Sequence, residues 1–376
     1  MTPDATSRFR ILRTGADGLA AMLEAIRTAG RTVRLETYIF RDSTVGRRFL
    51  DALVGAQARG VAVHVLVDAF GSIELPESFW APLREAGGKV RWFNPMSLKR
   101  WTYRDHRKLL VCDDHLAILG GFNVADEYDG DGVTSGWRDL GLEVTGPLAH
   151  HLTHAFDRMY GLAEFRHRRL QRLRKAIVRI DAQANWQILS TSPGGRHGEI
   201  KHALAWDLVH ARNVRIATGY FLPTRRLRRS FRRVVKRGGR VQLLLAGHSD
   251  VLLAQLASRW FYGSLLRSGV EVYEYQPQMF HAKLIVIDDV VYVGSANLDT
   301  RSLSINYELL LRIDDPALAA EAAAMFDADL QHCHCIVREN WLRSRTWWNK
   351  LRESWAFLLL AKLDPLLARR QLKALR

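Results

Sequence analysis

Cysteine is scarce in this sequence, with only three among 376 residues: Cys112, Cys333 and Cys335. So few cysteines cannot form a disulfide framework, and we therefore expect a reducing compartment. Two of them belong to the stretch His332-Cys333-His334-Cys335, but no Cys-x-x-Cys motif accompanies it to complete a tetrahedral zinc site. We therefore expect neither a metal nor any other cofactor.

Long apolar runs are also missing. The sequence has no run of about twenty apolar residues, so we expect no transmembrane helix. The first ten residues are polar and are not followed by the apolar core of a secretory signal. A lipid substrate would therefore be reached from outside the bilayer, and we expect a peripheral protein on the cytoplasmic side of the cell membrane.

Acidic residues are fewer than basic ones, 39 against 55, which gives a net charge of +16. This excess favours a polyanionic partner, either nucleic acid or an anionic membrane, and charge alone does not choose between them. Residues 166–175 are strongly basic, which fits a solvated face as well as an anion-binding one. Residues 225–240 contain nine basic residues along a helical pattern whose apolar side packs inward.

One motif occurs twice. The pattern H-x-K-x4-D begins at His106 and again at His281, and each copy is followed by G-[GS]-x-N, ending at Asn123 and Asn297. A motif of this length that recurs once in each half indicates a duplicated fold. The two copies are expected to face each other in one composite site.

The residue types of the motif indicate its chemistry. A His and a Lys two positions apart on a strand share a face, where they offer an imidazole and a cation to one anion. The apolar residues that follow the Lys predict a buried strand. The glycine permits close approach of backbone to a ligand, and the Asn adds an amide donor. Two such sets form a phosphate site, in which one His attacks phosphorus and the other protonates the leaving oxygen.

Alternating and helical patterns predict α/β layers in both halves. The predicted strands are 10–12, 32–40, 61–67, 90–93, 116–119, 139–144, 213–221, 241–245, 270–275 and 306–313, with the two motif strands. The predicted helices are 18–29, 44–58, 147–160, 223–237, 251–268 and 316–334, and residues 126–136 predict a loop beside the site.

Both copies of the motif resemble the signature of the phospholipase D superfamily. Further segments, residues 38–42, 66–72, 137–139 and 220–223, resemble bacterial cardiolipin synthases of the shorter type without transmembrane helices. The resemblance covers roughly residues 10–340. It implies a duplicated phospholipase D-like α/β fold, with two mixed-sheet halves and their helices related by a pseudo-twofold axis around one composite active site.

This resemblance divides the chain into two halves, residues 1–165 and 186–340. A basic linker, residues 166–185, lies between them. A tail rich in Trp, Arg and Leu, residues 341–376, follows the second half.

The resemblance also assigns roles to residues. His106 is expected to be the nucleophile that forms a phosphatidyl-histidine intermediate, and His281 the general acid and base. The groups expected to bind phosphate oxygens are Lys108, Lys283, Asn123 and Asn297, with Gly121 and Ser295 beside them in the substrate pocket. The motif carboxylates Asp113 and Asp288 complete the catalytic motifs as structural supports.

Two further acids are expected to support the histidines of the opposite halves. Glu308 is predicted to bond to His106, and Asp139 to His281, which would fix each imidazole and stabilise its charged form. Two departures affect this pocket. Gly121 stands where many relatives have Ser, and the second motif has one residue fewer before Gly294, which requires a tighter hairpin.

The expected activity is phosphatidyl transfer that makes cardiolipin, from phosphatidylglycerol and a second phospholipid, either phosphatidylglycerol or phosphatidylethanolamine. Two alternatives remain open: a phospholipase D that releases phosphatidic acid, and a phosphodiesterase or nuclease. The tail mixes Trp with basic residues beside an apolar stripe, as in an interfacial helix, although the same stripe also fits docking on the protein's own core. We favour phospholipid substrates and an anionic membrane surface as partners, and do not expect nucleic acid.

Overall fold

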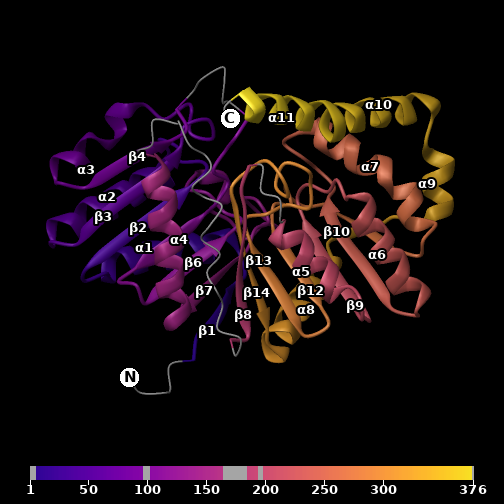
Figure 1. Ribbon diagram of the computed structural model, residues 1–376, viewed down its shortest axis with the longest axis horizontal. Coiled ribbons are helices and arrows are strands. Elements are labelled where there is room, and N and C mark those ends of the chain that lie inside the picture. The colour runs from indigo at the N-terminus through magenta and orange to yellow at the C-terminus, as the bar shows by residue number, and fades with distance from the viewer. Residues whose placement is uncertain (1–5, 96–101, 164–183, 194–197, 375–376) are drawn as a thin grey trace. The chain divides into compact units, whose positions relative to one another are not determined.

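The computed structural model describes residues 6–95, 102–163, 184–193 and 198–374 (Figure 1). The chain divides into two compact units, Met1–Arg172 together with Arg376, and Leu173–Leu375. This division falls within the basic segment 166–185, of which residues 166–183 lie outside the described residues. Each unit is built around its own mixed β-sheet.

The first unit contains a seven-stranded sheet in the order β1-β7-β6-β5-β2-β3-β4. Its strands are β1 (Arg8–Leu12), β2 (Thr32–Thr37), β3 (Ala62–Asp68), β4 (Lys89–Phe93), β5 (Leu109–Cys112), β6 (Leu116–Gly120) and β7 (Gly141–Thr145). Its helices are α1 (Gly15–Thr28), α2 (Thr44–Ala58), η1 (Glu77–Trp80), α3 (Ala81–Glu85), η2 (Asp126–Tyr128) and α4 (Pro147–Ala163).

The second unit contains an eight-stranded sheet in the order β15-β11-β10-β9-β12-β13-β14-β8. Its strands are β8 (Trp186–Thr191), β9 (Asn213–Thr218), β10 (Arg240–Ala246), β11 (Glu271–Tyr275), β12 (Lys283–Ile287), β13 (Val290–Gly294), β14 (Glu308–Asp314) and β15 (Cys333–Cys335). Its helices are α5 (Glu199–Asp207), α6 (Arg225–Lys236), α7 (Leu252–Leu266), α8 (Pro316–Leu330), α9 (Arg338–Ser344), α10 (Trp347–Leu358), a π-helical turn (Leu359–Leu363) and α11 (Asp364–Ala374).

The two sheets have the same topology. When the first is written as β4-β3-β2-β5-β6-β7-β1, each strand has a counterpart in β11-β10-β9-β12-β13-β14-β8. The motif strands β5 and β12 are central in both, and each is antiparallel to both of its neighbours. Every residue of these two strands is buried, as expected for apolar runs covered on both faces. The predicted duplicated α/β fold is confirmed.

Two predicted strands end earlier than their sequence suggests. The strand predicted at 32–40 ends at Thr37, because the Thr37 hydroxyl donates to the carbonyl of Ile39 and turns the backbone out of the sheet. The strand predicted at 213–221 ends at Thr218, whose hydroxyl lies 3.1 Å from the carbonyl of Tyr220. A β-branched residue that favours strands here also provides the hydrogen bond that ends one.

Other boundaries differ as well. The helix predicted at 316–334 ends at Leu330, and Cys333–Cys335 instead forms strand β15 on the edge of the sheet beside β11. The hairpin after β12 is indeed tighter than its counterpart, with Asp288 and Asp289 between the strands, where three residues separate β5 from β6. Strand β8 and helices α3 and α5 were not predicted, because their short segments lack a clear periodicity.

The tail continues as helix past Pro365. The backbone widens into the π-helical turn Leu359–Leu363 before α11 begins at Asp364. Pro365 therefore lies in the first turn of α11, where a missing backbone N–H costs little. Helix α10 packs on α7, where the rings of Phe357 and Trp260 stack with centroids 4.2 Å apart. In Figure 1 this yellow helical segment runs alongside α7.

Candidate active site

The first motif places its imidazole and its ammonium group on one face. The Nζ atom of Lys108 donates to the carbonyl oxygen of His106 at 2.6 Å. The ring of Tyr38 contacts the His106 ring edge-on, with centroids 4.9 Å apart, and Lys108 Nζ lies 5.2 Å from the centre of the same Tyr38 ring. Lys108 is almost completely buried, whereas His106 is partly exposed. The aromatic ring therefore orients both groups.

The second motif repeats this arrangement more tightly. Lys283 Nζ lies 2.8 Å from Nδ1 and 2.9 Å from Nε2 of His281, and it also donates to the His281 carbonyl oxygen. The aromatic neighbour is Tyr220, whose ring centroid is 6.4 Å from that of His281. Gly219 occupies the position that Tyr38 has in the first unit, and a Cβ atom there would approach the Phe280 carbonyl oxygen to 2.8 Å. The two half-sites thus use different tyrosine positions.

The two motif asparagines occupy equivalent positions. Each directly precedes a residue that bridges to the segment following β2 or β9, in the pairs Phe40–Val124 and Phe221–Leu298. The side-chain oxygen Oδ1 of Asn123 accepts from the Ile39 N–H at 3.0 Å, and the side-chain nitrogen Nδ2 donates to the Tyr128 hydroxyl at 2.7 Å. Tyr128 belongs to the predicted loop 126–136, which therefore does lie beside the site.

Asn297 is held by fewer contacts than Asn123. The Thr218 hydroxyl lies 3.3 Å from its Oδ1 atom, and the side chain is buried. Because an amide nitrogen carries two hydrogens, both asparagines have the donor chemistry to bind a phosphate oxygen. The shorter hairpin after β12 does not move Asn297 away from the position of Asn123.

Asp139 and Glu308 are equivalent in the sheet register, although their distances from the motif histidines in sequence differ. Gly120 pairs with Gly141, and Gly294 pairs with Leu310, so each acid stands two residues before the partner of the motif glycine. The Ser295 hydroxyl donates to Glu308 Oε2 at 2.6 Å.

In the first unit the corresponding space is filled by the acid itself. A Cβ atom on Gly121 would approach Asp139 Oδ1 to 2.2 Å. Glycine at this position is therefore required by the present position of the Asp139 carboxylate, which accepts the Leu140 N–H at 2.8 Å. Both acids are fully buried.

Each motif aspartate lies at the end of its motif strand that is farther from the motif histidine. Asp113 accepts the backbone N–H groups of Gly30, Arg31 and Thr32 at 2.7 to 2.8 Å, and these bonds outweigh burial to lower its pKa. Asp288 accepts the N–H groups of Arg212 and Asn213 at 2.8 to 3.1 Å. Both have positive φ angles, 55° and 49°. They fasten the strand before the hairpin and are separated from the histidines by the length of β5 or β12.

A buried cluster of charged residues surrounds the first motif, and sequence reasoning missed most of it. Arg107 Nη2 lies 3.1 Å from Glu36 Oε2, and the Arg107 N–H donates to Asp105 Oδ1 at 3.2 Å. Asp68 Oδ2 accepts the Asp105 N–H at 2.8 Å, and Asp68 Oδ1 lies 3.6 Å from Arg104 Nη1. All five side chains are buried, and two of them directly flank His106 in the sequence.

Burial governs the protonation of these acids. It raises the pKa of Glu36 despite the nearby Arg107 guanidinium. It also raises the pKa of Asp105 well above its ordinary value, and the neighbouring Glu36 charge adds to the shift. Burial raises the pKa of Asp68 to about 7, against the opposing effect of Arg104. The cluster therefore retains protons that carboxylates on a surface would lose.

The second unit has no such cluster at the equivalent positions. The register pairs Glu36 with Leu109 and Ala217 with Leu284, so Ala217 replaces Glu36. By the same correspondence, Asp68 is replaced by Ala246, Arg104 by Met279, Asp105 by Phe280 and Arg107 by Ala282. His106 thus belongs to a charged surrounding, whereas His281 belongs to an apolar one. One signal in the sequence was available: a Glu within the apolar strand at 32–37.

Metal ligands are not gathered in the part of the chain that the structure describes, where no group of three or more His, Cys, Asp or Glu side chains could hold an ion. In the stretch His332–Cys335, the Cys333 thiol contacts the Asp329 carbonyl oxygen at 3.2 Å. The three cysteines are free.

Comparison with known proteins identifies the repeated fold. The family model described as "Cardiolipin synthase, PLD-like domain" matches residues 22–160 and 208–330. The major cardiolipin synthase ClsA of Bacillus subtilis is 32% identical over 93% of this chain and 74% of its own length. Cardiolipin synthase B of Salmonella typhimurium is 31% identical over 96% of this chain and 89% of its own length.

The solved structures extend the fold comparison. The crystal structure of phosphatidylserine synthase from Haemophilus influenzae superposes with a TM-score of 0.76, covering 96% of this chain and 94% of that chain at 15% identity. At this identity the similarity concerns the fold.

The charged cluster predicts how stability depends on pH. The folded protein retains the Asp68 proton up to about pH 7, whereas an unfolded Asp releases it near pH 4. The free energy of unfolding should therefore fall as the pH rises between these values. In Asp68→Asn this contribution is absent. The free energy of unfolding of this variant should therefore decline by roughly 1–3 kcal/mol less than that of the unmodified protein between about pH 5 and about pH 8. Urea unfolding across this pH range measures it.

The matched control is Asp51→Asn, which makes the same charge change at an exposed position of α2. Its pH profile should follow that of the unmodified protein. If Asp68→Asn and Asp51→Asn show the same slope, the Asp68 carboxyl does not retain its proton.

Proposed function

The chain belongs to the family of phospholipase D-like cardiolipin synthases, and we propose that it joins two phospholipids by phosphatidyl transfer to form cardiolipin. The observation that carries the proposal is the pair of register-equivalent half-sites, each with an imidazole, a buried ammonium group and an amide. Such groups bind and attack a phosphodiester without a metal. Phospholipids are the substrates that this family membership implies.

The first half-reaction forms a covalent intermediate. A ring nitrogen of His106 attacks the phosphorus of phosphatidylglycerol, and the bond between phosphorus and the glycerol oxygen breaks. His281 gives its proton to that oxygen, so glycerol leaves as a neutral alcohol. The product is a phosphatidyl group on His106. This step requires both histidines to reach one phosphate, which is part of the proposal.

The second half-reaction reverses the roles of the groups. His281, now neutral, takes the proton from a free hydroxyl of a second phosphatidylglycerol as that oxygen attacks phosphorus. The bond between phosphorus and His106 breaks, and cardiolipin leaves. The contrast between the ionisable residues around His106 and the apolar residues at the equivalent positions around His281 supports this assignment, because only ionisable groups can adjust their charge as the ring changes its own.

Lys108 and Lys283 stabilise the negative charge on the non-bridging oxygens, and Asn123 and Asn297 add amide donors. We also propose that Glu308 supports His106 and that Asp139 supports His281, each from the opposite half. A carboxylate on the far ring nitrogen fixes the tautomer and stabilises the imidazolium. Asp113 and Asp288 act as structural supports.

The acceptor and the membrane complete the proposal. Phosphatidylethanolamine is a second candidate for the donor, and water in place of the acceptor would give a phospholipase D. In the described part of the chain, no helix is long and apolar enough to cross a membrane. We propose peripheral attachment instead, on the cytoplasmic side, where free cysteines such as those found here persist.

The tail supports this attachment. One of its faces is docked on the second unit through Phe357 and Ala356. The opposite face exposes a stripe of large apolar side chains: Trp347, Trp348, Leu351, Trp355, Leu358, Leu359, Leu363, Leu366 and Leu367. A docked helix with an exposed Trp and Leu face is suited to the interfacial region of a bilayer. The same stripe argues against nucleic acid as the substrate.

The products test the activity. Incubation with phosphatidylglycerol liposomes should yield cardiolipin and one glycerol per transfer. Added glycerol should drive the reaction backward, because glycerol is a product and the same catalytic groups serve the transfer in both directions. With labelled phosphatidylglycerol, acid-labile label should be trapped on the protein and should be absent from His106→Gln. Phosphatidic acid as the main product would indicate a hydrolase, and no lipid product would leave the nuclease alternative.

The acid beside Gly121 provides a second prediction. Gly121→Ser should displace the Asp139 carboxylate and lower turnover by roughly tenfold or more, to a similar extent as Asp139→Asn. The double variant Gly121→Ser/Asp139→Glu recreates the pair found at Ser295 and Glu308, and should recover part of the lost turnover. Cardiolipin formation in detergent micelles measures these rates.

Thermal unfolding controls for loss of fold in these variants. Glu308→Gln should lower turnover similarly, since it leaves the Ser295 hydroxyl an acceptor but removes the charge. Unchanged turnover in both Glu308→Gln and Asp139→Asn would contradict the proposed support of the histidines.

The tail provides the third prediction. Replacing Trp348 and Trp355 by Ala should weaken binding to liposomes by roughly tenfold, because both rings are exposed and Trp prefers the bilayer interface. Sedimentation with liposomes measures the binding. The matched control is Leu252→Ala together with Leu253→Ala, which removes exposed apolar side chains elsewhere in the second unit. Equal binding of the tail variant and the unmodified protein would exclude the tail as an anchor.

A further inference from the structure

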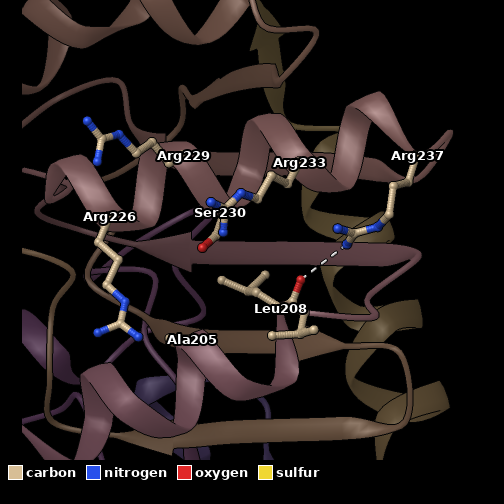
Figure 2. Close-up of a pocket in the computed structure, with 8 residues that line it drawn as sticks. Ala205, Leu208, Arg226, Arg229, Ser230, Arg233 and Arg237 are labelled. Atoms are coloured by element: carbon tan, nitrogen blue, oxygen red, sulfur yellow. Dashed lines mark hydrogen bonds between the residues drawn. The ribbon is translucent and has the colours of Figure 1, made fainter.

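A groove lined by arginines lies in the second unit between α6 and the end of α5 (Figure 2). Its volume is about 390 Å³, within the range of small-molecule sites. Arg226, Arg229, Arg233 and Arg237 line it along α6, and Ala205, Leu208 and Val209 line it from the other side. One wall is therefore cationic and the other largely apolar.

The arginines form a continuous stripe. They recur every three or four residues, so they share one face of α6 over about 17 Å. All four are exposed. Arg237 donates to the Leu208 carbonyl oxygen at 3.3 Å, as the dashed line in Figure 2 marks. The side chains of the other three make no ion pair or hydrogen bond with a described residue, and no carboxylate is among the lining residues.

Positive charge is crowded around this groove. Seven of the twelve residues of α6 are basic and none is acidic. Burial, together with the charges of Arg225 and Arg229, lowers the pKa of the neighbouring Arg228. Like charges at this density repel one another, and a bound anion relieves that repulsion. Guanidinium groups bind phosphate oxygens through paired N–H donors.

The side of the groove opposite the arginines carries exposed apolar side chains. Val209, which lines it, is 50% exposed, and Trp206, which follows the lining residue Ala205 on α5, is 78% exposed. A Trp at such a position is typical of a surface that meets the bilayer interface. A phosphate group would contact the arginines, and the glycerol backbone of a lipid would contact Leu208 and Val209. This combination fits an anionic phospholipid better than a single-stranded nucleic acid, whose bases typically stack on aromatic side chains, because no aromatic residue is among the lining residues.

We propose that this groove is a second phosphate site, outside the H-x-K-x4-D motifs, that holds the headgroup of an anionic phospholipid in the membrane. The site deepens the proposed function, on which it rests, because it would keep the enzyme on membranes rich in its anionic substrate and product. Its ligand is not consumed there, since the described lining residues include the Ser230 hydroxyl but no histidine or carboxylate that could activate it.

Phosphatidic acid is the suitable probe. It carries the phosphate but has neither a headgroup alcohol to release nor a hydroxyl to accept a phosphatidyl group, so its binding is independent of turnover. The test variant is Arg226→Gln/Arg229→Gln/Arg233→Gln. The control is Arg225→Gln/Arg232→Gln/Lys236→Gln, which removes the same charge from exposed positions of the same helix outside the groove.

The test variant should bind vesicles of phosphatidylcholine with phosphatidic acid roughly 10- to 100-fold more weakly, and the control less than about threefold more weakly. In titration calorimetry with short-chain phosphatidic acid below its micellar concentration, the test variant should bind one molecule fewer per protein than the control. Turnover of phosphatidylglycerol in detergent micelles should stay within about twofold for both variants.

Three other outcomes would overturn the groove as a lipid site. Equal weakening by both variants would indicate diffuse electrostatic attraction. No weakening would indicate that the groove is not used. If the test variant lost affinity for an oligonucleotide and retained vesicle binding, the ligand would be nucleic acid. A protein that made no cardiolipin but showed the expected binding would contradict the proposed function and leave the groove intact.

Discussion

The fold depends most on keeping an ammonium group buried beside an imidazole. Lys108 and Lys283 are each only 3% exposed, and both donate to the carbonyl oxygen of the motif histidine two residues earlier. Burying a cation is expensive unless negative charge compensates it, and the proposed phosphodiester substrate carries that charge. The apolar strand behind each Lys, fastened at its far end by Asp113 or Asp288, holds the cation in place. The order of residues in the motif thus places the cation at one end of a strand and the carboxylate that anchors the strand at the other.

Duplication repeats the geometry of the two half-sites but not their surroundings. In the first unit, Asp105 and Arg107 flank His106 and connect it to the buried Glu36 carboxyl group, whereas the equivalent positions of the second unit are apolar. A histidine that gains and loses a phosphatidyl group changes its charge during the reaction, and nearby ionisable groups can offset that change. A histidine that only transfers a proton needs a fixed ring orientation above all. The different surroundings therefore give two identical motifs a physical basis for unlike roles.

Much of this protein could be predicted from its sequence. The repeated motif fixed the central strands, and strict alternation located most of the others, because buried strands and amphipathic helices have strong periodicities. The equivalence of Asp139 and Glu308 was harder to see, because the loop 126–136 lengthens one half and only the sheet register removes the difference. Glu36 escaped notice because a single carboxylate in a strand resembles an exposed position. Its burial depends on Arg107, which reaches it from the segment before β5, and no local pattern encodes that contact.

The exposed apolar side chains are distributed unequally between the two units. Apart from Phe70 and Ile73, all the exposed large apolar side chains in the described residues belong to the second unit. That unit also carries the arginine groove and the tail. Apolar insertion gives adhesion to any bilayer, whereas guanidinium groups select bilayers that carry negative charge. An enzyme whose substrate and product are both anionic lipids needs the second property as well as the first, because adhesion alone would leave it on membranes that it cannot use. As proposed, the tail and the groove would meet these two needs with different chemistry, so each could change without loss of the other.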